Sequence, residues 1–399
     1  MSILKRTAPA LLLLASLQPP AHAQDNPRVP AHTLYAADGT TKAAEGPITL
    51  GIIGNTRGSL RGLDSRSKVS GVTQSLIADM TAQASSLDVL VMMGDHVQSG
   101  NVVEWRRFHN RFEALLADSD SSSSGTLPAI VVAGDRESLG DERLANWGSA
   151  FPGVGVDIGY SRVASWYGFD IDSDGHTWRI LVLDSGKDRL GSRWNEQLSW
   201  LSEEAAGRFD SLIVLMHEPL LDLSGGPMNR DGAPLELLET IEESTSLLKI
   251  RAVITAGSHA NQVMLPDGPF GSLYLNAGGG GAPAMDLRRW GAAEAAGRSE
   301  DIHLEAMFDL ALLSAFSEWS TIHNIPEAVM SQAQASGSFE GFVGSLTARY
   351  MPTYGWWTMS LEGSEASVLF RHRMPNGDIE DRYRVHLHPE AGWKGSSSP

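Results

Sequence analysis

Five short loops rich in glycine and polar residues each follow a brief apolar run. They are GNTRG (residues 54–58), GDHVQSG (94–100), GDRE (134–137), MHEP (216–219) and GSHAN (257–261). A short apolar run bounded by such residues is typical of a buried strand. Because the carboxyl ends of parallel strands meet at one edge of a sheet, we expect the five loops to form a single site there.

The segments between these loops predict a sheet covered by helices on both faces. Short β-rich runs predict strands at residues 48–54, 87–93, 129–133, 179–184, 211–216 and 252–256. Apolar residues at helical spacing predict helices at residues 69–86, 102–117, 194–207 and 234–248.

The chain changes character after the four glycines at residues 278–281. An Ala-, Glu- and Leu-rich stretch predicts a helical insertion at residues 282–340, and strands are expected again within residues 341–390. Asn376 and Gly377 predict a two-residue hairpin turn between the last two of these strands, ahead of a tail at residues 391–399. We expect one elaborated domain with residues 47–281 as its core.

The N-terminus predicts export. Lys5 and Arg6 precede an apolar run at residues 8–17, and Ala21-His22-Ala23 supplies a cleavage site, so residues 1–23 read as a signal peptide cut after Ala23. A polar lead-in follows at residues 24–46. No stretch reaches the roughly 20 apolar residues of a membrane span, and the chain has no cysteine. We expect a periplasmic or secreted protein without a membrane span.

The net charge excludes one class of partner. The formal charge is −17 at pH 7, and no cluster of Lys and Arg offsets it. Such a surface repels polyanions, so no nucleic-acid partner is expected. The sequence also lacks HExxH, GxSxG and GxxxxGK(S/T) motifs. Oligomeric state is not predicted.

The five loops resemble the motifs of calcineurin-like metallophosphoesterases, which read GDxHG, GDxxxxG, GNH(D/E), an isolated His, and GHxH. Asp184-Ser185, Gln197 and Trp200-Leu201 resemble a further LDS…Q…WL segment of exported members. The resemblance covers about residues 47–281. It implies an α/β/β/α sandwich of two mixed sheets, and hydrolysis of a phosphoester by a water activated between two divalent ions.

The resemblance also identifies metal-ligand positions, and several of them have changed. The positions of interest in this chain are Asp95, Asp135, His217 and His259 as metal ligands, and Asn55, Arg57, Arg136, Ser258 and Ala260 as departures from the pattern. An arginine cannot ligate a metal. One site would retain only Asp95 and is expected to be empty. The other, with Asp95, Asp135, His217 and Ser258 or His259, predicts at most one Zn, Mn or Fe ion.

The two arginines allow two interpretations. A guanidinium can take the place of a metal by pairing with a carboxylate, either Arg57 with Asp95 or Arg136 with Asp135. Both arginines can also act as a clamp for phosphate oxygens. His96 and Glu137 are close to the predicted site and are interpreted as solvated residues.

Three functions remain open. The first is an exported, catalytically impaired protein that binds a phosphorylated small molecule or a protein. The second is a one-metal phosphoester hydrolase, a phosphatase or phosphodiesterase, that uses Asp95, Asp135 and His217. The third is a structural role in which the helical insertion is the interaction surface. The first is favoured because Arg57, Arg136 and Ala260 together remove metal ligands and the proton donor.

Overall fold

The computed structural model describes twelve stretches of the chain. They are residues 43–44, 46–57, 63–116, 127–151, 165–219, 232–246, 249–266, 272–282, 346–351, 353–374, 376–389 and 392–396. The predicted signal peptide and nearly all of the predicted helical insertion lie outside the described residues.

The first of two sheets has seven strands in the order β15-β14-β13-β12-β2-β3-β4. Strands β2, β3 and β4 are parallel, and the remaining pairs are antiparallel. Their bounds are β2 (Ile48–Ile53), β3 (Val89–Met92), β4 (Ala129–Val131), β12 (Gly355–Glu362), β13 (Glu365–Arg373), β14 (Ile379–His388) and β15 (Gly392–Ser396).

The second sheet has eight strands in the order β1-β5-β6-β7-β8-β10-β9-β11. Its central strands β6, β7, β8 and β10 are parallel. The bounds are β1 (Ala43–Ala44), β5 (Tyr167–Ser173), β6 (His176–Val182), β7 (Ser211–Leu215), β8 (Ile250–Thr255), β9 (Asn261–Pro266), β10 (Leu273–Ala277) and β11 (Leu346–Met351).

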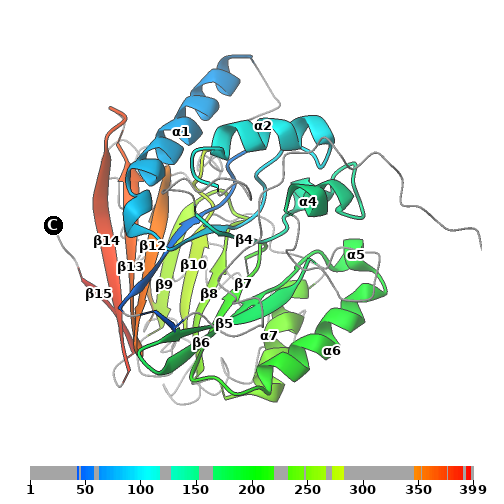
Figure 1. Ribbon diagram of the computed structural model, residues 1–399, viewed down its shortest axis with the longest axis vertical. Helices are drawn as coiled ribbons and strands as arrows, with labels where there is room; N and C mark the ends of the chain where they lie inside the picture. Colours follow the sequence, from blue (N-terminus) through cyan, green and yellow to red (C-terminus); the bar gives the residue numbers. More distant parts are fainter. Residues whose placement is uncertain are drawn as a thin grey trace, which may run out of the picture.

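Helices cover the outer face of each sheet (Figure 1). Residues of α1 (Leu63–Ala82), α2 (Val102–Phe112) and α4 (Ala145–Ala150) pack on the seven-stranded sheet. Residues of α6 (Arg193–Ala205) and α7 (Ala233–Ser244) pack on the eight-stranded sheet. The described residues also form three short helices: the 3₁₀ turn η1 (Ala84–Ser86), α3 (Asp135–Ser138) and α5 (Lys187–Leu190).

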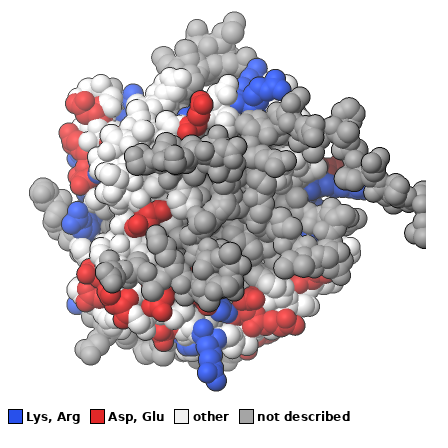
Figure 2. All heavy atoms as spheres, in the orientation of Figure 1, with Lys and Arg blue, Asp and Glu red and all other residues white. Residues whose placement is uncertain are grey.

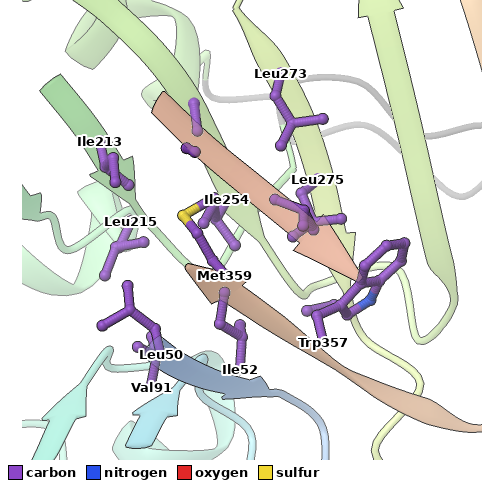
Figure 3. Packing of buried hydrophobic residues seen from close by; sticks show 14 of the residues in the cluster. Leu50, Ile52, Val91, Ile213, Leu215, Ile254, Leu273, Leu275, Trp357 and Met359 are labelled. Carbon is purple, nitrogen blue, oxygen red and sulfur yellow. The ribbon is translucent and has the colours of Figure 1, made fainter. Parts of the chain in front are cut away.

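The main core lies between the two sheets. Leu50 and Ile52 point into it, whereas Ile53 packs against the helices on the other face, as the two-residue period of a strand requires. Figure 3 shows Leu50, Ile52 and Met359 of one sheet packed with Ile254 and Leu215 of the other. The predicted α/β/β/α sandwich of two mixed sheets is therefore confirmed.

The strands and helices predicted before residue 282 and the strands predicted after residue 340 agree with the described structure, but the predicted two-residue turn is wrong. Five residues separate the end of β13 at Arg373 from the start of β14 at Ile379. Gly377 has a positive φ of 98°, whereas Asn376 is not among the residues with positive φ. The Asn376 Oδ1 instead accepts a hydrogen bond of 3.1 Å from the Asp378 N–H, which stabilises a different local turn. Further along, β15 occupies much of the predicted tail.

One tyrosine links the edges of the two sheets. Tyr167, the first residue of β5, places its hydroxyl against Val131 of β4, the last strand of the other sheet. The hydroxyl accepts from the Val131 N–H at 2.9 Å and donates to the Val131 carbonyl at 3.0 Å. Both backbone groups of this buried residue are thus satisfied by one side chain.

No helix within the described residues is long and apolar enough to cross a membrane. On the face in Figure 2, acidic side chains gather along the lower edge, in keeping with the formal charge of −17.

Candidate functional site

The loops predicted to share a site do converge. Each follows a parallel strand, and backbone hydrogen bonds join them: the Asn55 N–H donates to the Gly94 carbonyl at 3.0 Å, and the Gly257 N–H donates to the His217 carbonyl at 2.8 Å. The four glycines after β10 join the same edge, since the Gly280 N–H donates to the Gly54 carbonyl at 3.0 Å. The site therefore lies at the carboxyl ends of strands from both sheets.

Asp95 is the centre of the cluster and is almost fully buried. Its Oδ2 lies 3.1 Å from the Nη1 of Arg57, and its Oδ1 accepts a 2.9 Å hydrogen bond from the Arg136 N–H. The Nε2 of His217 lies 3.6 Å from the same Oδ1. Burial alone would raise the pKa of Asp95, but His217, Arg57 and the Arg136 N–H outweigh it and lower that pKa. Asp95 is therefore held as a carboxylate.

The guanidinium of Arg57 joins two loops that the sequence separates by about two hundred residues. Its Nη1 pairs with Asp95, and its Nη2 lies 2.7 Å from the Nε2 of His259. Because a guanidinium has only donors, the Nε2 of His259 is the acceptor and its ring is neutral in this contact. His259 thus reaches the site, and the Arg57–Asp95 pair predicted as a metal replacement is present. The alternative pair is not found: among the described side chains, no ion pair joins Arg136 to Asp135.

His217 is buried beside Asp95. Its Nδ1 donates a 2.7 Å hydrogen bond to the carbonyl of Met93, which fixes the ring and directs the Nε2 toward Asp95. Burial disfavours the charged ring, but the carboxylates of Asp95 and Asp135 outweigh burial, and the pKa of His217 is raised.

Glu137 was expected to be solvated, and this interpretation is wrong: the side chain is fully buried. One oxygen accepts from the N–H groups of Asp95 and Gly134 at 2.9 Å each, and the other accepts from the His96 N–H at 2.8 Å. These bonds fix the loop that carries Asp95 against the loop after β4. The sequence signal was the position of Glu137 as the third residue of a helix that follows Gly134. A side chain at that position can accept a hydrogen bond from the backbone N–H of the residue before the helix.

His96 is the second residue wrongly expected to be solvated. Its Nε2 accepts from the Gly94 N–H at 3.0 Å, and its Nδ1 therefore carries the proton that is shared with the Thr56 hydroxyl at 2.8 Å. Burial lowers the pKa of His96 to about 3, so the ring is neutral. From α2, Arg111 donates to the carbonyls of Thr56 and His96 at 2.9 and 2.8 Å. His96 and Arg111 thus stabilise the loops that carry Thr56 and Asp95.

The backbone of the site is strained at three residues. Five described residues other than glycine have positive φ, and three of them are in the site: Asn55 (51°), Asp95 (57°) and His259 (54°). Such conformations are costly and persist where the surrounding structure imposes them, often at functional sites. The Asn55 Nδ2 donates to the Ala256 carbonyl, while its Oδ1 is buried without a hydrogen-bond partner.

Two glycines permit the close approach of the loops. A Cβ at Gly94, where φ is 86°, would lie 2.7 Å from the Nδ1 of His217. A Cβ at Gly134 would lie 2.7 Å from the Asp95 nitrogen and 2.8 Å from its Oδ1. Neither position tolerates a side chain without displacing the cluster.

The remaining predicted site residues differ from one another in how far they are buried. Asp135 is exposed and Arg136 is half-buried at the start of α3. Ser258 is buried, and its Oγ accepts a 2.9 Å hydrogen bond from Gln262; Ala260 is buried as well.

The LDS…Q…WL segment supports the His217 loop. Gln197 bonds both backbone groups of Asp184, at 2.8 and 2.9 Å. The next residue, Ser185, accepts a 3.1 Å hydrogen bond from the Glu218 N–H, directly after His217.

Comparison with known proteins rests on structure alone. No protein-family model matches the sequence, and no curated protein matches it. Among solved structures, the chain is similar to purple acid phosphatase PPD1 from seeds of yellow lupin (Lupinus luteus), with 13% identity, a TM-score of 0.53, and coverage of 85% of this chain and 53% of that one. It is also similar to PhoD, with 11% identity, a TM-score of 0.50, and coverage of 89% and 72%.

The chain has a calcineurin-like metallophosphoesterase fold. It spans about half the length of the lupin phosphatase. At this level of identity the likeness concerns the fold, so the chemistry of the site has to be argued from the residues present.

The residues at this metallophosphoesterase-fold site do not fit a two-metal centre. The buried, unpartnered Oδ1 of Asn55 is a suitable metal ligand. However, the guanidinium of Arg57 already contacts both Asp95 and His259, where a second cation would be repelled. Within the described residues, no three His, Cys, Asp or Glu side chains are arranged to hold a metal ion. The predicted ligand set of Asp95, Asp135, His217 and His259 is therefore not assembled as such a group.

Proposed function

We propose that this is an exported protein of metallophosphoesterase fold that binds a phosphorylated ligand at the Asp95 cluster without a two-metal centre. One observation carries the proposal: the guanidinium of Arg57 lies between Asp95 and His259, at 3.1 and 2.7 Å. A permanent cation there neutralises the buried carboxylate, so that the neighbouring Arg136 can attract an anion without opposition from the charge of Asp95.

Arg136 is the residue we expect to contact the ligand. It is half-buried, and its N–H donates to Asp95, so the backbone that carries its side chain is fixed beside the cluster. Arg57 uses one N–H of each terminal nitrogen in its contacts with Asp95 and His259. A guanidinium has five N–H groups, so donors remain for a phosphate oxygen. The two arginines would then act together on the phosphate, as the sequence suggested.

Hydrolysis by this fold's two-metal chemistry is less well supported than binding. Two divalent ions would supply a polarised phosphoester and an activated water. Here Asp95 forms an ion pair with Arg57, and Asp135 is exposed. The one-metal hydrolase and the assembly role therefore rank behind phospho-ligand binding; the insertion on which the assembly role depends lies outside the described residues.

Calorimetric titration with O-phospho-L-serine and p-nitrophenyl phosphate tests the proposal. We expect saturable binding of at least one probe in the presence of EDTA, and a loss of tenfold or more in the Arg136→Ala variant. Arg106→Ala, which removes an exposed arginine of α2, is the matched control and should bind like the parent protein. Binding that requires an added divalent ion, or p-nitrophenol release that requires one, would favour the hydrolase instead.

A further inference from the structure

A second basic feature lies outside the Asp95 cluster. A partly open cavity of about 230 Å³ lies between the segment that enters α4 and the α5–α6 corner. The helices α4 and α5 are on the right of Figure 1. Three of its seven lining residues are arginines and one is acidic. The lining consists of Glu142, Arg143, Leu144, Ser165, Arg189, Leu190 and Arg193. None of these residues belongs to the site described above.

Arg189 lacks an acceptor for part of its guanidinium. Its Nη2 pairs with the buried carboxylate of Asp184, but its Nη1 is buried without a hydrogen-bond partner. A buried donor without an acceptor is destabilising. Since Arg189 lines the cavity, an oxygen atom of a bound anion is the group that would satisfy it.

Two further arginines surround the same space. The guanidinium of Arg193 stacks over Trp166, with its Cζ 4.5 Å from the ring centroid, and its Nε lies 3.6 Å from the Oε2 of Glu196, so its plane is held in place. Arg143 is exposed, and within the described residues no carboxylate lies within ion-pair distance of it. The neighbouring Leu144 has a positive φ of 53°, a strained conformation for a branched side chain, at the point where Arg143 leads into α4.

We propose that this cavity binds a small oxoanion of the phosphate or sulfate class. Guanidinium groups present paired N–H donors that match such oxygens. Arg189 and Arg193 already pair with Asp184 and Glu196, so the anion would be bound by their remaining N–H groups and by Arg143. The volume is below the roughly 300–1,000 Å³ typical of pockets for drug-sized ligands, so the occupant is a small anion or one acidic group of a longer ligand. The inference does not depend on the function proposed above.

Trp166 provides the readout for a test. Phosphate and sulfate are titrated at constant ionic strength while tryptophan fluorescence is recorded. We expect a saturable change that is absent from the Trp166→Phe variant. Arg143→Glu should weaken binding at least tenfold, and Arg143→Gln should weaken it by a smaller factor. Arg106→Glu makes the same change of charge on an exposed arginine that does not line the cavity, and should bind within twofold of the parent.

Three results would overturn the proposal. The first is the absence of a saturable signal with either anion. The second is an equal loss of affinity in Arg143→Glu and Arg106→Glu, which would indicate a general effect of charge. The third is tighter binding of succinate than of phosphate, which would assign the cavity to carboxylates. Arg136→Ala should leave the Trp166 signal unchanged, so failure of this proposal and failure of the Asp95-site proposal can be told apart.

Discussion

The Nη1 of Arg57 and the Oδ2 of Asp95 lie 3.1 Å apart, and their side chains are only 8% and 4% exposed. Two opposite charges are thus buried together at the carboxyl ends of the central strands. Each is costly to bury alone, and their attraction offsets that cost only while both are present. The stability of the site should therefore depend on the pair as a unit.

Removing one partner should be more harmful than removing both. Arg57→Ala leaves Asp95 buried without its cation, and we expect the free energy of unfolding to fall by about 3–5 kcal/mol. The double variant Arg57→Ala/Asp95→Ala should lose less than this single variant. Urea denaturation measures both.

Arg107→Ala is the control for this experiment, because Arg107 pairs with Glu104 at an exposed position and should contribute about 0–1 kcal/mol. A loss below 1 kcal/mol in Arg57→Ala would mean that the ion pair does not stabilise the fold.

Glu137 should matter through its acceptor oxygens. Glu137→Gln keeps the size of the side chain but turns an NH₂ group toward N–H donors of Asp95, Gly134 or His96. We expect a loss of about 1–3 kcal/mol, because the NH₂ group leaves at least one buried N–H donor without an acceptor. Thermal and urea unfolding provide the measurement. Glu142→Gln, at an exposed position of the same segment, should change stability by less than about 0.5 kcal/mol. Equal stability of the two variants would contradict the bracing role.

The neutral His96 predicts sensitivity to acid. Its pKa is lowered from 6.5 to about 3, so the unfolded chain binds a proton near pH 6.5 that the folded protein does not. The stability contributed by His96 is fully present above pH 6.5 and is lost as the pH falls. At about 1.4 kcal/mol per pH unit, the loss between pH 6.5 and 4.5 should be about 2–3 kcal/mol.

The pKa of His217 is raised, so its contribution is fully present below pH 6.5 and does not decline in this window. Urea denaturation at both pH values should therefore show a steeper decline for the parent protein than for His96→Asn. Parallel declines would rule out a buried neutral His96.

Replacing the buried Arg57 by a residue that can ligate a metal should create a metal site. Arg57→His removes the charge between Asp95 and His259 and adds an imidazole to a cluster that already holds His217. We expect elemental mass spectrometry to find about one equivalent of Zn²⁺ in this variant after dialysis against ZnCl₂, and much less in the parent protein. The metal should be lost again in Arg57→His/His217→Ala. A full equivalent in the parent, lost in His217→Ala, would instead support the one-metal hydrolase.

The fold could be predicted because its elements carry local signals. Apolar runs such as residues 48–54, followed by glycine and a polar residue, predicted the central strands and the edge at which the site lies. The short strand β15 carries no such signal, because its position depends on pairing with β14. The turn at Asn376 was misjudged because its side chain can satisfy either of two turns.

At the site, the sequence identified the charges but not their surroundings. The Arg57–Asp95 pair followed from a cation and a carboxylate in loops that were expected to meet. His96 was misjudged because nothing in the sequence distinguishes a polar loop residue facing water from one that bonds the Gly94 N–H. Glu137 was misjudged because its place at the third position of a short helix, from which it accepts three backbone N–H groups, was not used as a signal. Whether His259 reached the site depended on its left-handed backbone, with a φ of 54°, which spacing alone does not reveal.

Tyr167 has a consequence beyond the two hydrogen bonds it makes. β4 is the terminal strand of its sheet, and an open strand edge is a template on which a second molecule can add a strand. The tyrosine hydroxyl fills the donor and acceptor positions of Val131 that an incoming strand would need. A single phenol thereby replaces, at Val131, the hydrogen bonds that a further strand would make at that edge.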